Sequence, residues 1–178
     1  MWGALGSSFS ALLAFCLSIH AQTLSPSQAL ASIGRTPILS KGESTLLTKS
    51  ESLSVRVKIS THEVDNGTPG SPKKPKGVFC TGSRYPCSVV DSMQISVNGH
   101  PLGIGSSVYS DLADLNSGGL KIDKNIAVLT LYGGDAALSY ILKIQMSPTR
   151  LQKWTLSSAL APGKPLEERI YHDISIGP

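Results

Sequence analysis

LSVRVKI (residues 53–59) alternates apolar and polar side chains at every position. In an extended chain successive side chains point to opposite faces, so the four apolar residues fall together on one face. The serine, the arginine and the lysine fall on the other face. LSVRVKI therefore predicts a β-strand with one buried face, and it is the clearest element in the chain.

Further segments show β-strand patterns, and turn signals separate them; they lie at 89–97, 119–123, 126–132, 138–146, 150–157 and 166–172. Asn98-Gly99 predicts a tight hairpin turn after the first of these segments. In the segment 138–146, alternation places Leu138 on the same face as Leu142 and Ile144. This order of short strands and turns predicts a mainly β protein, an antiparallel β-sandwich or a small barrel of about eight strands.

Residues 106–115 (SSVYSDLADL) have a different period. Val108, Leu112 and Leu115 are spaced as residues on one face of a helix, and Ser106 or Ser107 can cap its start. We therefore expect one short helix inserted among the strands.

The chain has 178 residues, which suits one domain. Hydrophobic residues make up 40% of it, enough for a core, and the net charge is +4. We predict a signal peptide at 1–21, an irregular lead-in at 22–50 with a short strand at 44–48, and a β-rich domain at 51–178. Within that domain, residues 65–77 (DNGTPGSPKKPKG) carry almost no apolar side chains and predict a long, flexible loop.

The signal peptide is predicted from the apolar run ALLAFCLSI at 11–19. This run is shorter than the roughly 20 residues of a transmembrane helix, but it has the size of the apolar region of a secretory signal, with cleavage after Ala21. The residues before the run contain no Lys or Arg, which departs from the usual signal. We expect a periplasmic or secreted protein whose mature chain has no transmembrane segment.

Removal of the signal peptide leaves two cysteines, Cys80 and Cys87. In an exported protein such a pair indicates a disulfide, and the C-x6-C spacing differs from the C-x-x-C of redox pairs. A structural bridge closing this short loop stabilises the fold by roughly 2–2.5 kcal/mol in the chain-entropy model. The bridged loop carries Ser83, Arg84 and Tyr85, and Arg and Tyr are enriched at binding hot spots. These three residues are our candidate partner-binding loop.

No sequence pattern predicts catalytic residues, a metal site or a cofactor. His62, His100 and His172 are scattered, and HEVD (62–65) lacks the second histidine of an HExxH motif. Basic and aromatic residues are not interleaved as nucleic-acid binding requires, so we expect no nucleic acid as a partner. Because a catalytic triad assembles in space, a hydrolase with a cryptic site stays an alternative.

Two long stretches, CSVVDSMQISVNGHPLGIGSSVYSDLADLNSGGLKI (87–122) and LTLYGGDAALSYILKI (129–144), resemble a family of small exported bacterial proteins with no assigned activity. The resemblance covers roughly residues 78–172. It implies a Gram-negative, periplasmic setting.

A second resemblance is local. TGSRY (81–85) is similar to the SGxxY loop of periplasmic lysozyme inhibitors, with Thr81 in place of the serine. It implies an inhibitor that would act through residues 81–85, and we find no second inhibitor motif.

Together these observations favour an exported, non-enzymatic β-domain that binds a protein, a glycan or another component of the cell envelope. The lysozyme inhibitor and the hydrolase are the alternatives. The sequence leaves the oligomeric state open.

Overall fold

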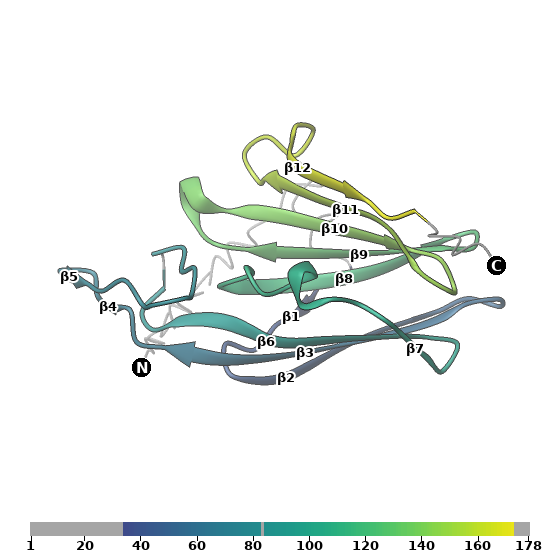
Figure 1. Cartoon of the computed structure of the whole chain (residues 1–178), viewed down its shortest axis with the longest axis horizontal. Coiled ribbons are helices and arrows are strands. Elements are labelled where there is room, and N and C mark those ends of the chain that lie inside the picture. The colour runs from purple at the N-terminus through teal and green to yellow at the C-terminus, as the bar shows by residue number, and fades with distance from the viewer. Residues whose placement is uncertain (1–33, 83, 173–178) are drawn as a thin grey trace, which may run out of the picture. The chain divides into compact units, whose positions relative to one another are not determined.

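The computed structural model describes residues 34–82 and 84–172, and their strands form two main antiparallel sheets (Figure 1). The larger sheet has the order β1 (Thr36–Pro37), β8 (Leu115–Asp123), β9 (Ile126–Gly133), β10 (Tyr140–Met146), β11 (Leu151–Ser158), β12 (Pro165–Ile170). The smaller has the order β2 (Gly42–Lys49), β3 (Ser54–Val64), β6 (Cys87–Val97), β7 (His100–Leu102). The short strands β4 (Gly67–Thr68) and β5 (Ser71–Pro72) form a separate hairpin.

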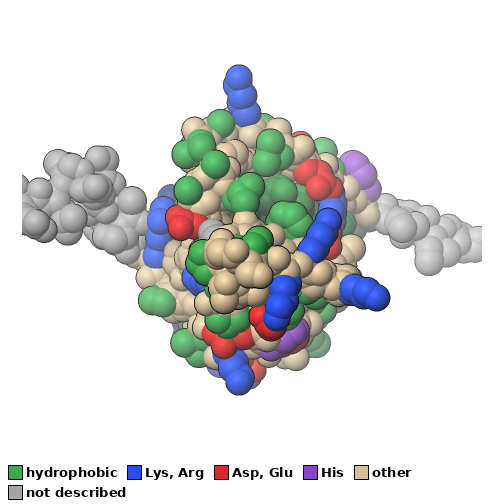
Figure 2. Space-filling model, turned by 90° about the vertical axis from the view of Figure 1, so that its left-hand side faces the viewer, with side chains coloured by type: hydrophobic (Ala, Val, Ile, Leu, Met, Phe, Trp, Pro, Cys, Tyr) green, Lys and Arg blue, Asp and Glu red, His purple; other side chains and the backbone are tan. Residues whose placement is uncertain are grey.

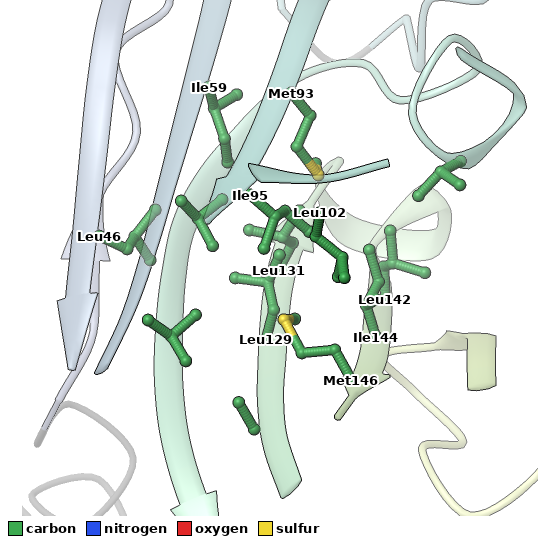
Figure 3. Close-up of a cluster of buried hydrophobic side chains, with 14 of the residues drawn as sticks. Leu46, Ile59, Met93, Ile95, Leu102, Leu129, Leu131, Leu142, Ile144 and Met146 are labelled. Carbon is green, nitrogen blue, oxygen red and sulfur yellow. The ribbon is translucent and has the colours of Figure 1, made fainter. Parts of the chain in front are cut away.

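One hydrophobic core joins the two main sheets. Ile59, Met93 and Ile95 enter it from the smaller sheet, and Leu131 and Leu142 enter it from the larger sheet (Figure 3). These side chains are almost fully shielded from water. Because each large aliphatic side chain gains about 1.5–3 kcal/mol on burial, this shared core holds the two sheets together.

The alternation of LSVRVKI is confirmed in β3. Val55, Val57 and Ile59 are fully buried, whereas Arg56 is exposed and Lys58 is half-buried. The predicted hairpin turn is also confirmed, because Asn98 and Gly99 both have positive φ angles and join the paired strands β6 and β7.

The predicted helix over 106–115 is wrong. Only a 3-10 helix, η1 (Ser106–Val108), forms there, and Leu115 already begins β8. Val108, Leu112 and Leu115 are buried as their spacing suggested, but the backbone from Leu112 onward pairs with β6. Val90 donates its N–H to the Leu112 carbonyl at 3.2 Å, and Asp114 donates its N–H to the Ser88 carbonyl at 2.6 Å. These long-range backbone bonds replace the bonds that a helix would have made.

Two other expectations about the fold need correction, and a third is confirmed with a longer strand. The described strands form open sheets, so the barrel alternative is wrong, because β1 and β12 are separate edges of the larger sheet. The described residues contain twelve strands instead of about eight, since two-residue pairings such as β1, β4 and β5 leave no alternating pattern in the sequence. Within the lead-in, the short strand expected at 44–48 is confirmed but is longer, since Gly42–Lys49 pairs along its whole length with β3.

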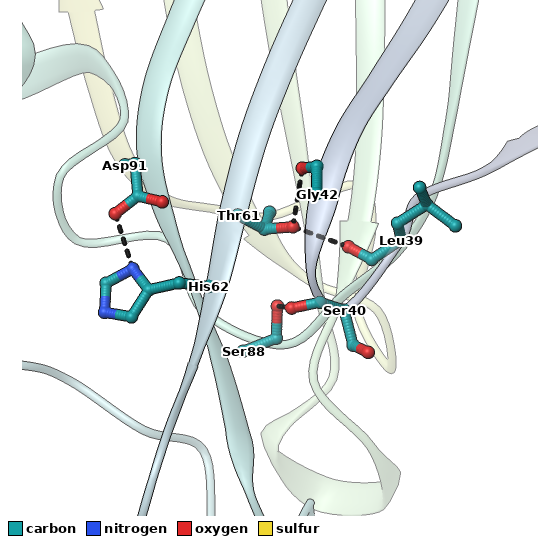
Figure 4. Close-up of polar contacts among 7 residues, drawn as sticks. All are labelled: Leu39, Ser40, Gly42, Thr61, His62, Ser88 and Asp91. Atoms are coloured by element: carbon teal, nitrogen blue, oxygen red, sulfur yellow. Dashed lines mark hydrogen bonds and ion pairs between the residues drawn. The ribbon is translucent and has the colours of Figure 1, made fainter.

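Polar contacts hold the crossing between the two sheets, where the chain passes from β1 to β2. The Thr61 hydroxyl donates to the carbonyl of Leu39 at 2.8 Å and also lies 3.2 Å from that of Gly42 (Figure 4). The Ser88 hydroxyl donates to the carbonyl of Ser40 at 2.8 Å. These bonds give hydrogen-bond partners to backbone carbonyl groups between β1 and β2. A carbonyl group that is shielded from water without such a partner would destabilise the fold.

The predicted signal peptide lies outside the described residues. Within residues 34–82 and 84–172, no helix is both long enough and apolar enough to cross a membrane.

Gly118 tests the contact between the sheets. A methyl group at this position would lie 2.8 Å from a side-chain carbon of Leu131 in the larger sheet and 2.8 Å from one of Leu46 in the smaller sheet. We expect Gly118→Ala to lower the free energy of unfolding by about 1–3 kcal/mol, measured by urea unfolding, because the core has no room for it.

Gly163→Ala is the matched control, since a methyl group there meets nothing within 4 Å. Both substitutions lower the conformational entropy of the unfolded chain by the same amount. The difference between their free energies of unfolding therefore measures the effect of the close packing at Gly118. Equal stability of the two variants would contradict the close packing of the sheets at Gly118.

Candidate functional site

The structure joins Cys80 and Cys87 in a disulfide, as predicted, with their Cα atoms 5.9 Å apart. Cys87 is the first residue of β6 and is fully buried. The bridge therefore fixes one end of the loop 80–87 to the smaller sheet.

Asp114 fixes the same loop through hydrogen bonds. Its side chain is 1% exposed, and one carboxyl oxygen accepts from the Thr81 hydroxyl at 2.5 Å and from the Thr81 N–H at 3.3 Å. The other oxygen accepts from the N–H of Ser88 at 2.9 Å. Asp114 has a φ of 51°, a left-handed conformation that Asp and Asn adopt more readily than most residues. This backbone conformation turns the Asp114 carboxyl group, which lies just before β8, toward the disulfide loop.

Asn66 is a second buried polar residue that supports the loop. Its amide group donates to the Arg84 carbonyl at 2.8 Å and accepts from the Cys87 N–H at 3.1 Å. Its own carbonyl accepts from the Lys73 N–H at 2.8 Å. The segment 65–77 is therefore tied to the disulfide loop at its start, although its lysines are exposed.

The predicted partner-binding residues lie on this supported loop. Ser83 lies outside the described residues, and Arg84 and Tyr85 are half-buried. The Arg84 guanidinium donates to the Asn116 side chain at 2.6 Å, and Asn116 in turn donates to the Gly134 carbonyl at 2.7 Å. Arg84 is thus directed toward the start of β8, and its role in binding a partner stays a prediction.

An apolar groove, which we call the Phe79–Leu138 groove, opens beside the disulfide loop with a volume of about 210 Å³. Its apolar lining comes from Val108 and Leu112, from Tyr140, Trp154 and Leu156 on β10 and β11, and from Phe79 and Leu138. Figure 2 shows hydrophobic side chains gathered in a hollow on this end of the molecule, with acidic side chains at its edge.

Phe79 and Leu138 stand out in this groove because both are large, apolar and exposed. Phe79 is 62% exposed and Leu138 is 57% exposed. The prediction that Leu138 begins the strand and shares a face with Leu142 and Ile144 is wrong, because the strand begins two residues later and Leu138 ends the 3-10 helix η2 (Ala136–Leu138). Asp135 caps η2 by accepting the Ala136 N–H at 2.7 Å, which fixes the turn that presents Leu138.

Hydrogen bonds to Asp114 and Ala113 hold the segments that carry Phe79, Leu138 and Tyr140. The Asp114 side chain binds Thr81, two residues after Phe79, and its carbonyl accepts the Gly134 N–H at 3.0 Å in the turn before Leu138. The Tyr140 hydroxyl donates to the Ala113 carbonyl at 2.6 Å. Burial raises the pKa of Tyr140, so its phenol keeps the proton that it donates.

Charged groups form one side of the groove. Arg169 on β12 donates to the Glu167 side chain at 2.7 Å and to the Ser107 carbonyl at 2.8 Å, and its guanidinium covers the Trp154 ring at 4.4 Å. The Trp154 indole N–H is satisfied by the Val108 carbonyl at 3.1 Å. Asp111 adds a further acidic group to the lining.

The three scattered histidines do not meet. His62 contacts Asp91 at 2.5 Å on an exposed part of the smaller sheet (Figure 4), His100 is exposed in β7, and His172 borders a separate cavity with Arg150. In the part of the chain that the structure describes, no serine or threonine hydroxyl hydrogen-bonds to His62.

The fold and the site define a class of protein: two antiparallel sheets, with an apolar groove beside a loop that a disulfide supports. Comparison with protein-family models, with curated proteins and with solved structures found no match.

The Asp114 contacts generate a stability prediction. The substitution Asp114→Asn replaces one acceptor oxygen of the side chain with an N–H₂ group. This group would face an N–H or O–H donor of Thr81 or Ser88, and two donors cannot bond to each other. Asparagine still adopts the left-handed backbone conformation, so the substitution tests the side chain alone. We expect the free energy of unfolding to fall by about 1–3 kcal/mol, measured by urea denaturation.

Asp123→Asn is the matched control, because Asp123 is exposed at the end of β8. It should change stability by less than about 0.5 kcal/mol. If both variants unfold at the same denaturant concentration, Asp114 does not hold the loop as the contacts indicate.

Proposed function

We propose that the protein is an exported, non-enzymatic β-sandwich domain, and that the Phe79–Leu138 groove receives an apolar side chain of a partner protein. One observation carries this proposal. Two large apolar side chains are exposed on the groove although a well-formed core is available a few residues away. An exposed apolar hollow with a polar edge is typical of interaction sites.

The groove is also prepared for binding. Its sides are fixed by the disulfide, by the buried Asp114 bonds and by the η2 cap. A site that is ordered before binding loses less conformational entropy when the partner arrives. This support favours a binding role over a merely tolerated surface patch.

The lining favours a protein over a glycan. Sugars need many polar groups and an open aromatic face, whereas Arg169 covers the Trp154 ring and the groove surface is mainly apolar. Aliphatic and aromatic side chains match such a lining, and the charges of Asp111, Glu167 and Arg169 can orient the polypeptide around them.

The chemistry of the cysteines supports the proposed location. A disulfide persists in oxidising compartments, which supports a periplasmic or secreted location and the resemblance to exported bacterial proteins. The mature protein would meet its partner in the cell envelope or outside the cell.

The lysozyme-inhibitor alternative stays a separate prediction on residues 81–85. It requires Arg84 to leave Asn116 and enter a lysozyme active site. If it holds, micromolar protein should reduce lysozyme activity, and Arg84→Ala should restore that activity; unchanged lysozyme activity would dismiss it. The hydrolase alternative has less support, because the His62–Asp91 pair lacks a bonded hydroxyl nucleophile among the described residues.

The groove proposal can be tested with peptides selected from a random library on the intact protein. We expect the selected peptides to share a large apolar residue. Leu138→Asp should weaken their binding at least about tenfold, or about 1.4 kcal/mol, measured by calorimetry, because it places a charge in the apolar lining.

Leu47→Asp is the matched control, because Leu47 is 64% exposed on β2, in the smaller sheet, and does not line the groove. It should leave binding unchanged. Equal binding to both variants, or selection of peptides without an apolar residue, would overturn the proposal.

A further inference from the structure

The strand β12 is an open edge of the larger sheet. It pairs with β11 on one side, and no other described strand pairs with its second side. Tyr171, just after β12, donates its N–H to the Gln152 carbonyl at 3.0 Å. Because main-chain groups alternate in direction along a strand, the N–H and C=O groups of Glu168 and Ile170 point to the open side.

The side chains of β12 also divide into two faces. Arg169 pairs with Trp154 and Glu167 with Leu156, so Glu167 and Arg169 face the groove. Ile170 is 59% exposed and Leu166 is 68% exposed. An exposed edge with apolar side chains favours pairing with another strand.

The sequence LEERI (166–170) is complementary to its own antiparallel copy. With a two-fold axis at Glu168, Leu166 lies opposite Ile170 of the second copy, and Glu167 lies opposite Arg169 of the second copy. An axis at Glu167 would instead place two Glu167 side chains opposite each other, and an axis at Arg169 would do the same for two arginines. Of these three registers, the one centred on Glu168 forms two opposite-charge Glu167–Arg169 pairs, whereas the other two form none. Charge complementarity therefore favours the register centred on Glu168, although it also brings the two Glu168 side chains together.

The central pair of this register brings two glutamates together. Each Glu168 is bridged by Lys153 of its own chain at 2.8 Å, so each of the two neighbouring carboxylates already has a positive partner. Repulsion between the two glutamates is reduced by these lysines.

We propose that β12 binds a second copy of this chain by antiparallel β12–β12 pairing centred on Glu168, which joins the larger sheets of two protomers into one sheet. The partner's Glu167 would then stand opposite Arg169 at the edge of the Phe79–Leu138 groove. The pairing does not depend on what that groove binds.

The charges on β12 also account for selectivity. Charged residues and irregular pairing commonly protect sheet edges from unwanted strands, and the β11–β12 register shifts between Leu156 and Ser157. Here the charges have both signs, and they match only a strand with the opposite order. An edge of this kind discourages general aggregation and favours its own copy.

The test is sedimentation of the purified full chain from about 1 μM upward, the range of weak complexes with small interfaces. The wild type should pass from monomer to dimer as its concentration rises. Glu167→Arg places two arginines opposite each other, and Arg169→Glu places two glutamates opposite each other, so each variant alone should stay monomeric at concentrations that dimerise the wild type.

An equimolar mixture of these two variants restores both opposite-charge pairs, because one copy carries two arginines and the other two glutamates at positions 167 and 169. The mixture should therefore dimerise. Glu43→Arg, a charge reversal on the exposed strand β2, is the control and should dimerise as the wild type does.

Arg169 also contacts Trp154 and Ser107, so circular dichroism must show that Arg169→Glu is folded. If it is not, Glu168→Pro removes an outward N–H without altering the face toward the groove, and it should abolish the dimer. A wild type that stays monomeric at all concentrations, single variants that dimerise as the wild type does, or a mixture that stays monomeric would overturn the proposal.

Discussion

The buried carboxyl group of Asp114 is the contact on which the candidate site depends. This carboxyl group accepts hydrogen bonds from Thr81 and Ser88, and the backbone carbonyl of the same residue accepts one from Gly134. These partners belong to the disulfide loop, to β6 and to the turn before η2. One residue thus connects the smaller sheet with the two segments that carry Phe79 and Leu138. Because buried acceptors are costly to leave unpaired, these segments are held together as a unit.

The disulfide and Asp114 constrain different parts of the same loop. The bridge joins Cys80 to the start of β6, and Asp114 joins the next residue to the start of β8. Asn66 adds support from the segment 65–77. A surface apolar groove keeps its shape only if its sides cannot collapse inward, and this network of buried bonds supplies that resistance. The groove and its support are therefore one structural feature.

Local patterns in the sequence predicted much of the sheet structure but little of the site. LSVRVKI and the Asn98-Gly99 turn are confirmed, because alternation and turn chemistry act over a few residues. The helix over 106–115 was wrong because backbone pairing with β6 overrode its helical spacing. The strand pattern had placed Leu138 on the face of Leu142 and Ile144, and no local pattern had pointed to Asp114. Their positions depend on residues far away in the chain, which a single sequence does not reveal. The disulfide pair was predictable because only two cysteines follow the predicted signal peptide.

Hydrogen exchange of the Thr81 backbone amide tests the central role of Asp114 most directly. Thr81 lies in a loop outside any strand, yet its N–H donates to a buried oxygen. The contacts predict that this amide exchanges nearly as slowly as that of Val57 in the core strand β3, and far more slowly than that of its exposed neighbour Gly82. Exchange of Thr81 as fast as Gly82 would show that Asp114 does not hold the loop.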